Sequence, residues 1–203
     1  SFRVTRVLQG DRRDLVGESL LEGNAAAVLE ALREVVELRD QWPTVAYQKD
    51  GGGTGTHTFD FWARLSSGLR VAVAVKPARR VETSGLLRTI ELVRQQGVLR
   101  PFADATLIIT DTDVNRGPER NARRILRARR MRNEAEVEAA RAALAGVHGW
   151  VRFADLLKGF PIQAHRRNAL WCLIDEGFLV PRNGEEISDS TWVRVAPART
   201  DAA

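Results

Sequence analysis

A β-rich run that follows a glycine near the middle of the chain most constrains how this sequence can fold. Residues 69–75 read Leu-Arg-Val-Ala-Val-Ala-Val, and Gly68 marks the turn that precedes them. Because side chains alternate along a strand, the three valines of the run share one face, whereas Ala74 and Lys76 share the other. The run therefore predicts a strand that ends at a lysine.

Residues 57–61, which read His-Thr-Phe-Asp-Phe, predict a neighbouring strand that carries Asp60. An acid at the end of one strand and a lysine at the end of the next can converge on one metal-bound phosphate, which makes Asp60 and Lys76 candidates for catalysis. An acid and a lysine on adjacent strands are more often solvated surface residues, so the pair alone does not establish a site. His57 precedes Asp60 closely and is left without an assigned role.

The composition is typical of a soluble globular protein with an anionic partner. The 203 residues suffice for one medium domain and a small one, and the chain is 44% hydrophobic and 28% charged. It has no apolar run of about eighteen residues and no signal-peptide pattern, which predicts neither a membrane segment nor secretion. The single cysteine, Cys172, excludes an internal disulfide and fits a buried thiol in a cytoplasmic protein. The net charge of +5 and the pI near 10.3 favour nucleic acid as the partner.

The order of elements in the first 115 residues predicts an α/β sandwich around a small mixed sheet. The strand over 105–110 is expected to run parallel to its neighbour, because a helix precedes it. The predicted elements besides the two strands above are a helix over 17–38, a strand over 44–49, a glycine-rich turn over 50–55, a loop over 77–83, a helix over 84–96, the strand over 105–110, and helices from about 118 to 145.

Residues 150–197 have a different pattern of predicted elements, in which two helical segments precede a hairpin. This order predicts a small winged-helix-like domain, so the chain is divided into domains of residues 1–147 and 148–203. A structural cap on the larger domain is the alternative interpretation. The predicted elements are helices over 151–157 and 163–176 and strands over 178–180 and 191–195.

Five short motifs follow one another over about a hundred residues. They are Ser19-Leu-Leu-Glu22, Gln41-Trp-Pro43, Phe59-Asp60-Phe61, Val75-Lys76-Pro77, and Thr110-Asp111 with Val114-Asn115 and Asn121. In order and spacing they resemble the motifs of TnsA-type endonuclease subunits of heteromeric transposases, which are PD-(D/E)xK nucleases. The resemblance implies a restriction-endonuclease-like mixed sheet flanked by helices, with a small C-terminal winged-helix-like domain. It also implies a metal-dependent endonuclease that cleaves double-stranded DNA at transposon ends, together with a DDE transposase and an AAA+ ATPase.

The resemblance places Glu22, Asp60 and Lys76 in a catalytic site that uses Mg²⁺ or Mn²⁺. Hard divalent ions prefer carboxylate oxygen, so Asp60 and Glu22 would be metal ligands, with the Val75 backbone carbonyl as a further ligand. Lys76 would orient the attacking water or stabilise the developing charge. Because Glu22 also follows Ser19 at capping-box spacing, a helix-capping role is the alternative for it.

Position 74 departs from the family pattern. The nuclease class usually has Glu, Asp or Gln two residues before the lysine, whereas this chain has Ala74. Water can complete a Mg²⁺ site that has fewer protein ligands, and Glu91 on the next helix is a candidate substitute, although an exposed helix residue is the more ordinary interpretation. A catalytically impaired DNA-binding or scaffolding subunit is therefore the alternative function, and a stand-alone repair or restriction nuclease is the third.

Residues 116–132 hold eight arginines and one acid, Glu119. Four of these arginines fall at helical spacing and form a stripe suited to the DNA phosphate backbone, with a solvated helix face as the alternative. The tip of the C-terminal hairpin instead carries acids, which favours a protein partner over DNA for that domain. The stripe consists of Arg120, Arg123, Arg124 and Arg127.

Overall fold

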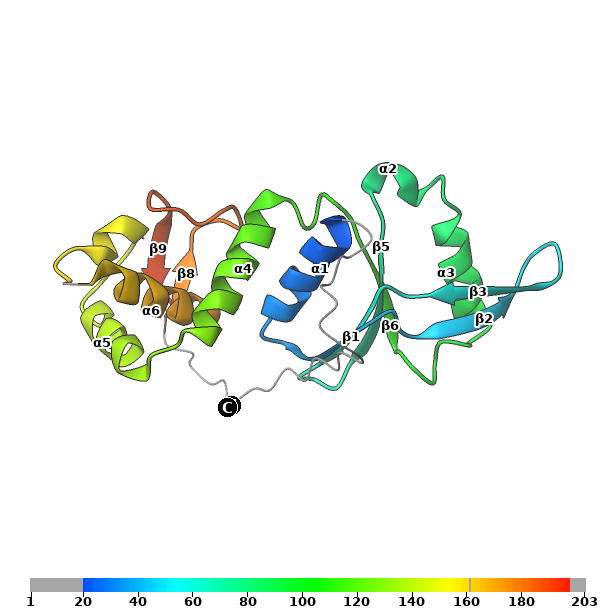
Figure 1. The fold of residues 1–203 in the computed structure, drawn as a ribbon, viewed down its shortest axis with the longest axis horizontal. Coiled ribbons are helices and arrows are strands. Elements are labelled where there is room, and N and C mark those ends of the chain that lie inside the picture. The colour runs from blue at the N-terminus through cyan, green and yellow to red at the C-terminus, as the bar shows by residue number, and fades with distance from the viewer. Residues whose placement is uncertain (1–19, 161, 198–203) are drawn as a thin grey trace. The chain divides into compact units, whose positions relative to one another are not determined.

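The structure, a computed structural model, describes residues 20–160 and 162–197. The chain divides into two compact units, and the division falls between Asn115 and Arg116 (Figure 1). Each unit has its own apolar core. Within the described residues, no helix is long and apolar enough to cross a membrane.

The first unit is built on a mixed four-stranded sheet of order β1-β4-β5-β6. The β1–β4 and β4–β5 pairs are antiparallel, and β5 and β6 are parallel, as the sequence predicts. Strands β2 and β3 form a separate antiparallel hairpin. The elements are α1 (Leu20–Ala31), β1 (Val35–Asp40), β2 (Thr44–Gln48), β3 (Thr54–Thr58), β4 (Phe61–Leu65), β5 (Arg70–Val75), α2 (Ala78–Val81), α3 (Leu86–Gln95) and β6 (Ala105–Ile109).

Different elements cover the two faces of this sheet. On one face, Ala25 of α1 packs in a cluster with Val73 and Val75 of β5. On the other, Val93 of α3 packs in a second cluster with Ala74 of β5 and with residues of the hairpin. The predicted alternation along β5 is confirmed, and the mixed sheet is flanked by helices as expected.

The helix predicted over residues 17–38 is shorter in the structure, because its C-terminal part forms a strand. Helix α1 ends at Ala31, and β1 begins at Val35. The apolar residues near this point fit helical spacing, but Val35 pairs with Leu65 of β4 and is only 3% exposed. Sheet pairing therefore outweighs the helical pattern here. Ser19, the expected N-cap of this helix, lies outside the described residues.

The second unit combines three α-helices with a three-stranded sheet of order β7-β9-β8. Both pairs in this sheet are antiparallel. The predicted hairpin is present as β8 and β9, and a short strand, β7, joins it where the sequence indicated the start of a helix. The elements are α4 (Arg116–Arg130), α5 (Glu134–Leu144), β7 (Val151–Arg152), the 3-10 helix η1 (Phe153–Leu157), α6 (Gln163–Asp175), β8 (Leu179–Pro181) and β9 (Trp192–Val195).

The boundary between the units differs from the predicted boundary after residue 147. Val137 and Leu144 of α5 are buried in one cluster with Leu173 of α6 and Val193 of β9. Salt bridges support this packing, because Arg129 of α4 pairs with Asp175 at 2.7 Å and other arginines pair with Glu176 at the end of α6. Helices α4 and α5 therefore belong to the C-terminal unit. The segment over 146–149, expected to be a linker, lies within the second unit, where its Val147 packs against the core.

Candidate functional site

Asp60 lies immediately before β4 and bonds to the end of β5. Its Oδ2 accepts a hydrogen bond from the Val75 backbone N–H at 2.7 Å, and its backbone carbonyl accepts one from Gln41 N–H at 2.8 Å. These contacts hold the half-buried carboxylate at the edge of the sheet. The second oxygen, Oδ1, forms no hydrogen bond with any described residue.

Lys76 follows β5 directly, at the same edge of the sheet. Its backbone N–H donates to Ile109 O at 3.0 Å, which extends the parallel β5–β6 ladder by one residue. The loop that follows is anchored to the loop after β6, because Ala78 N–H donates to Asp111 Oδ1 at 2.7 Å. The Lys76 ammonium group has no ion-pair partner among residues 20–160 and 162–197. Hydrogen bonds to the backbone thus hold Asp60 and Lys76 in place, and neither side chain forms an ion pair with a described residue.

Glu22 lies in the first turn of α1 and is half-buried. The neighbouring Leu21 packs against the cluster that contains Val75 and Ile109, the last residues of β5 and β6. Figure 1 likewise shows α1 starting toward the end of the sheet at which β5 leads into α2. The first turn of α1, which carries Glu22, thus packs against the cluster that includes the last residues of β5 and β6.

Ala74 lies in the apolar interior and does not line an open site. It is 2% exposed and packs in the cluster beneath α3 together with Phe59 and Trp62. Glu91, the candidate substitute, accepts a hydrogen bond from Gln95 of its own helix at 2.6 Å. Within the described residues, no three His, Cys, Asp or Glu side chains are grouped so as to hold a metal ion.

His57 joins this site, although its spacing alone gave it no role. It lies in β3 opposite Val45, and its ring packs edge-on against Phe59 with centroids 4.6 Å apart. Its Nε2 atom is buried and has no hydrogen-bond partner in the part of the chain that the structure describes. Burial lowers the pKa of His57, the nearby Asp60 carboxylate raises it, and the Lys76 ammonium group lowers it. The imidazole is therefore neutral near pH 7 and interacts electrostatically with both candidate residues.

The lowered pKa of His57 predicts a pH dependence of stability. As the pH falls below 6.5, the ordinary pKa of histidine, the unfolded chain takes up a proton at His57 more readily than the folded chain does. The free energy of unfolding therefore decreases as the pH falls, until the pH drops below the pKa of His57 in the folded chain. We expect the free energy of unfolding of His57→Phe, measured by denaturant titration, to depend less on pH than that of the wild type between about pH 7.5 and 5.5. Carboxylates whose pKa is lowered in the folded chain change stability at lower pH, outside this range. His165→Phe, at an exposed position, is the control. An identical slope in wild type and His57→Phe would contradict the burial argument, as would an NMR titration that places the His57 pKa above 6.5.

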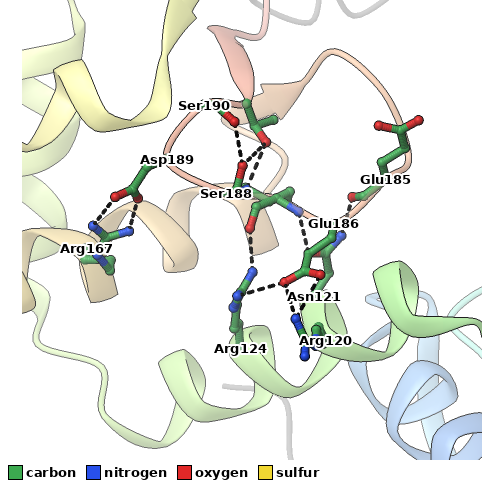
Figure 2. Close-up of polar contacts among 11 residues, drawn as sticks. Arg120, Asn121, Arg124, Arg167, Glu185, Glu186, Ser188, Asp189 and Ser190 are labelled. Carbon is green, nitrogen blue, oxygen red and sulfur yellow. Dashed lines mark hydrogen bonds and ion pairs between the residues drawn. The ribbon is translucent and has the colours of Figure 1, made fainter.

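Two arginines of the predicted stripe are used inside the second unit. Figure 2 shows Arg120 and Arg124 converging on Glu186, from the segment between β8 and β9. Arg120 Nη1 lies 3.0 Å from Glu186 Oε1, and Arg124 Nη2 lies 3.1 Å from the same oxygen. Arg124 also donates to Ile187 O. These contacts lower the pKa of Glu186, with the hydrogen bond from Arg120 as the largest cause that lowers it. Both guanidinium groups therefore anchor the hairpin segment.

The other two stripe residues are more exposed. Arg123 pairs with Glu119 one turn earlier on α4, and its side chain is 57% exposed. The Arg127 side chain forms no ion pair with a described residue, and its Nε donates to the Met131 sulfur at 3.5 Å. Arg123 and Arg127 thus remain accessible for phosphate.

The acidic hairpin tip is largely neutralised by neighbouring arginines. Besides Glu186, Asp189 accepts hydrogen bonds from Arg167 of α6 (Figure 2), and this guanidinium lowers the pKa of the Asp189 carboxyl. Asn121 of α4 fixes the same segment, since it donates to Glu185 O at 2.8 Å and accepts from Ile187 N–H at 2.9 Å. The repulsion from DNA phosphate that the sequence suggested is therefore much reduced.

Comparison with known proteins adds no family assignment. No protein-family model matches the sequence, and no curated protein shows significant similarity to it. The chemistry of the site must therefore be argued from its residues.

Proposed function

We propose that the chain is a metal-dependent DNA endonuclease subunit of a heteromeric transposase, which cleaves phosphodiester bonds at transposon ends. Its partners would be double-stranded transposon-end DNA, a DDE transposase and an AAA+ ATPase. The restriction-endonuclease-like assignment of the first unit and the winged-helix-like assignment of the second belong to the same proposal.

One observation carries this proposal. Asp60 and Lys76 lie at the same edge of a mixed sheet, each held by a backbone hydrogen bond, and neither charge is neutralised by a described side chain. Several other acids of the described fold pair with an arginine, as in Arg70–Asp104 at 2.7 Å. An acid and a lysine left unpaired at adjacent strand ends suit a ligand that brings both a cation and an anion, as a metal-bound phosphate does.

Asp60, Glu22 and the Val75 carbonyl carry the type of oxygen that a hard divalent ion prefers. Asp60 has a carboxylate oxygen that forms no hydrogen bond with a described residue, and Glu22 and the Val75 carbonyl would complete the protein ligands, with water at the remaining positions. When bound, Mg²⁺ or Mn²⁺ would supply a nucleophilic water near neutral pH and neutralise charge on the phosphate. Lys76 would hold its ammonium group near that phosphate and stabilise the charge that develops there. The Val75 N–H fixes the orientation of the Asp60 carboxylate.

Ala74 favours a second candidate function. Because residue 74 is an alanine buried among apolar side chains, the site lacks the oxygen ligand that the nuclease class usually places there. A chain with one ligand fewer would suit a DNA-binding or scaffolding subunit that has lost cleavage.

Reconstitution distinguishes these functions. We expect the purified chain alone to leave plasmid DNA nearly uncut in Mg²⁺, because a site with few ligands depends on partners to position DNA. Together with a DDE transposase, an ATPase and DNA that carries transposon ends, it should nick at those ends. Metal-dependent cutting of plain plasmid by the chain alone would support a stand-alone nuclease. Assembly on transposon ends without any nicking would support the scaffolding function.

A further inference from the structure

The outer face of the β7-β9-β8 sheet carries a set of tryptophans and arginines that the proposed cleavage does not use. In antiparallel strands, directly opposed residues and residues two apart share a face. Arg152 is opposite Trp192, and Arg194 is opposite Val180. The same period extends this face, named here the Trp–Arg face, to its six members: Trp150, Arg152, Val180, Arg182, Trp192 and Arg194.

The opposite face of this sheet packs against the core of the second unit. Val193 and Leu179 are buried in the core of the second unit, and Val151 packs against that core. Trp150 and Trp192 are 37% and 38% exposed. Large aromatic side chains on the solvent side of a sheet contribute little to the core, so their presence together on one face indicates an interaction surface.

The three arginines of this face lie over the indole rings. The guanidinium carbon of Arg152 is 4.7 Å from the centre of the Trp192 ring, and that of Arg194 is 4.9 Å from the centre of the Trp150 ring. Arg182 lies 5.9 Å from the Trp150 ring. These contacts hold flat cationic groups and flat aromatic groups side by side on an open sheet.

The arginines of the Trp–Arg face form no ion pair within the described fold. Arg182 and Arg194 have no acidic partner in residues 20–160 or 162–197, and Arg152 donates to the Ser190 backbone carbonyl at 2.8 Å while its charge contributes to the lowered pKa of the exposed Asp155. Arginines on the helices of the same unit are mostly paired with acids, as in Arg129–Asp175 and Arg167–Asp189. The face therefore presents three cations and no acid.

We propose that the Trp–Arg face binds single-stranded nucleic acid. Bases would stack on Trp150 and Trp192, and the three arginines would pair with the phosphates between them. A duplex hides the faces of its bases in its own stack, so it would meet the arginines but leave the indoles without stacking partners. An acidic peptide would likewise use only the arginines. This inference does not depend on cleavage, because a chain that fails to nick DNA can still bind a single strand through this face.

Fluorescence anisotropy with the full chain tests the proposal. The probes are a labelled single-stranded oligonucleotide of about 12 nucleotides and a duplex of the same length. We expect the single strand to bind more tightly, Trp192→Leu to weaken it about tenfold, and Trp192→Phe, which keeps an aromatic face, to weaken it less. Arg194→Ala should reduce the steepness of the salt dependence, a log–log slope, by about 0.7.

Arg130→Ala on α4 is the matched control, since it removes one exposed arginine of the same unit outside this face and should leave the affinity for the single strand nearly unchanged. Thermal unfolding of each variant separates loss of binding from loss of fold. Tighter binding of the duplex than of the single strand would overturn the proposal. So would absence of single-strand binding by the wild type, or wild-type affinity in folded Trp192→Leu.

Discussion

Asp60→Asn is expected to abolish nicking of transposon-end DNA by the assembled complex while leaving the fold intact. The amide oxygen of asparagine can still accept the hydrogen bond from Val75 N–H, so the local geometry is retained while the negative charge is lost. Asp60→Ala is a less informative change, because it leaves a half-buried N–H without its acceptor at a cost of about 1–3 kcal/mol in the free energy of unfolding. Gel assays of strand nicking and thermal unfolding of the same preparations give the two readouts.

Lys76→Met extends the same prediction to the second residue. Methionine keeps much of the apolar stem of the partly buried lysine and removes its ammonium group. We expect nicking to fall about 10²–10³-fold, which is the range for loss of one group that stabilises developing charge. Assembly with the transposase and the ATPase should be unaffected.

Two exposed positions of the first unit provide matched controls. Glu34→Gln before β1 and Lys49→Met after β2 make the same kinds of change, carboxylate to amide and lysine to methionine, away from the proposed site. They should nick at the wild-type rate. Wild-type nicking by folded Asp60→Asn or Lys76→Met would show that these residues do not carry cleavage.

Strand β5 follows directly from local sequence, whereas the strand predicted over residues 57–61 is divided between the end of β3 and the start of β4, with Asp60 between them. The alternation of valine and alanine in β5 matches two faces that are buried under different elements, and the helix before β6 correctly predicts a parallel pair. Asp60 and Lys76 reach the same edge of the sheet because β4 and β5 are antiparallel, so the start of β4 lies beside the end of β5. Strand propensity and turn residues are local properties, so they are visible without knowledge of tertiary contacts.

Features that depend on distant partners are not visible in this way. The apolar residues around Val35 fit a helix and a strand equally well, and pairing with β4 decides between them. In the sequence, the arginines of α4 resemble an open basic stripe. In the structure, Glu186, which lies 66 residues after Arg120, pairs with two of them. The orphaned Nε2 of His57 likewise arises from burial, which no spacing reveals.

The domain boundary is another feature that local sequence does not reveal. The glycines near residue 147 suggested a linker, yet Val147 packs against the core of the second unit, and its N–H donates to Leu144 O at 3.0 Å. Glycine permits a turn inside a domain as readily as a link between domains, so local composition does not decide between them. What decides is the shared apolar face of α5 and α6.

This shared core predicts where the chain can be divided. A fragment of residues 116–203 should fold and unfold cooperatively, whereas residues 148–203 alone should be unfolded. The shorter fragment lacks α4 and α5, so it exposes the apolar residues of α6, such as Leu173, and leaves Asp175 and Glu176 without their arginine partners. Circular dichroism and denaturant titration of both fragments measure the difference. A cooperatively folded 148–203 fragment would restore the boundary that the sequence suggested.

A pair of point variants in the full chain tests the same core without truncation. Leu144→Ala on α5 removes a side chain that is 4% exposed and should lower the free energy of unfolding of the second unit by about 2–5 kcal/mol. Met131→Ala, at a residue that is 58% exposed, should change it by no more than about 0.5 kcal/mol. If α5 lay outside this core, the two substitutions would have similar small effects. A large loss for Leu144→Ala alone, in the transition that the 116–203 fragment also shows, would locate α5 within the C-terminal unit.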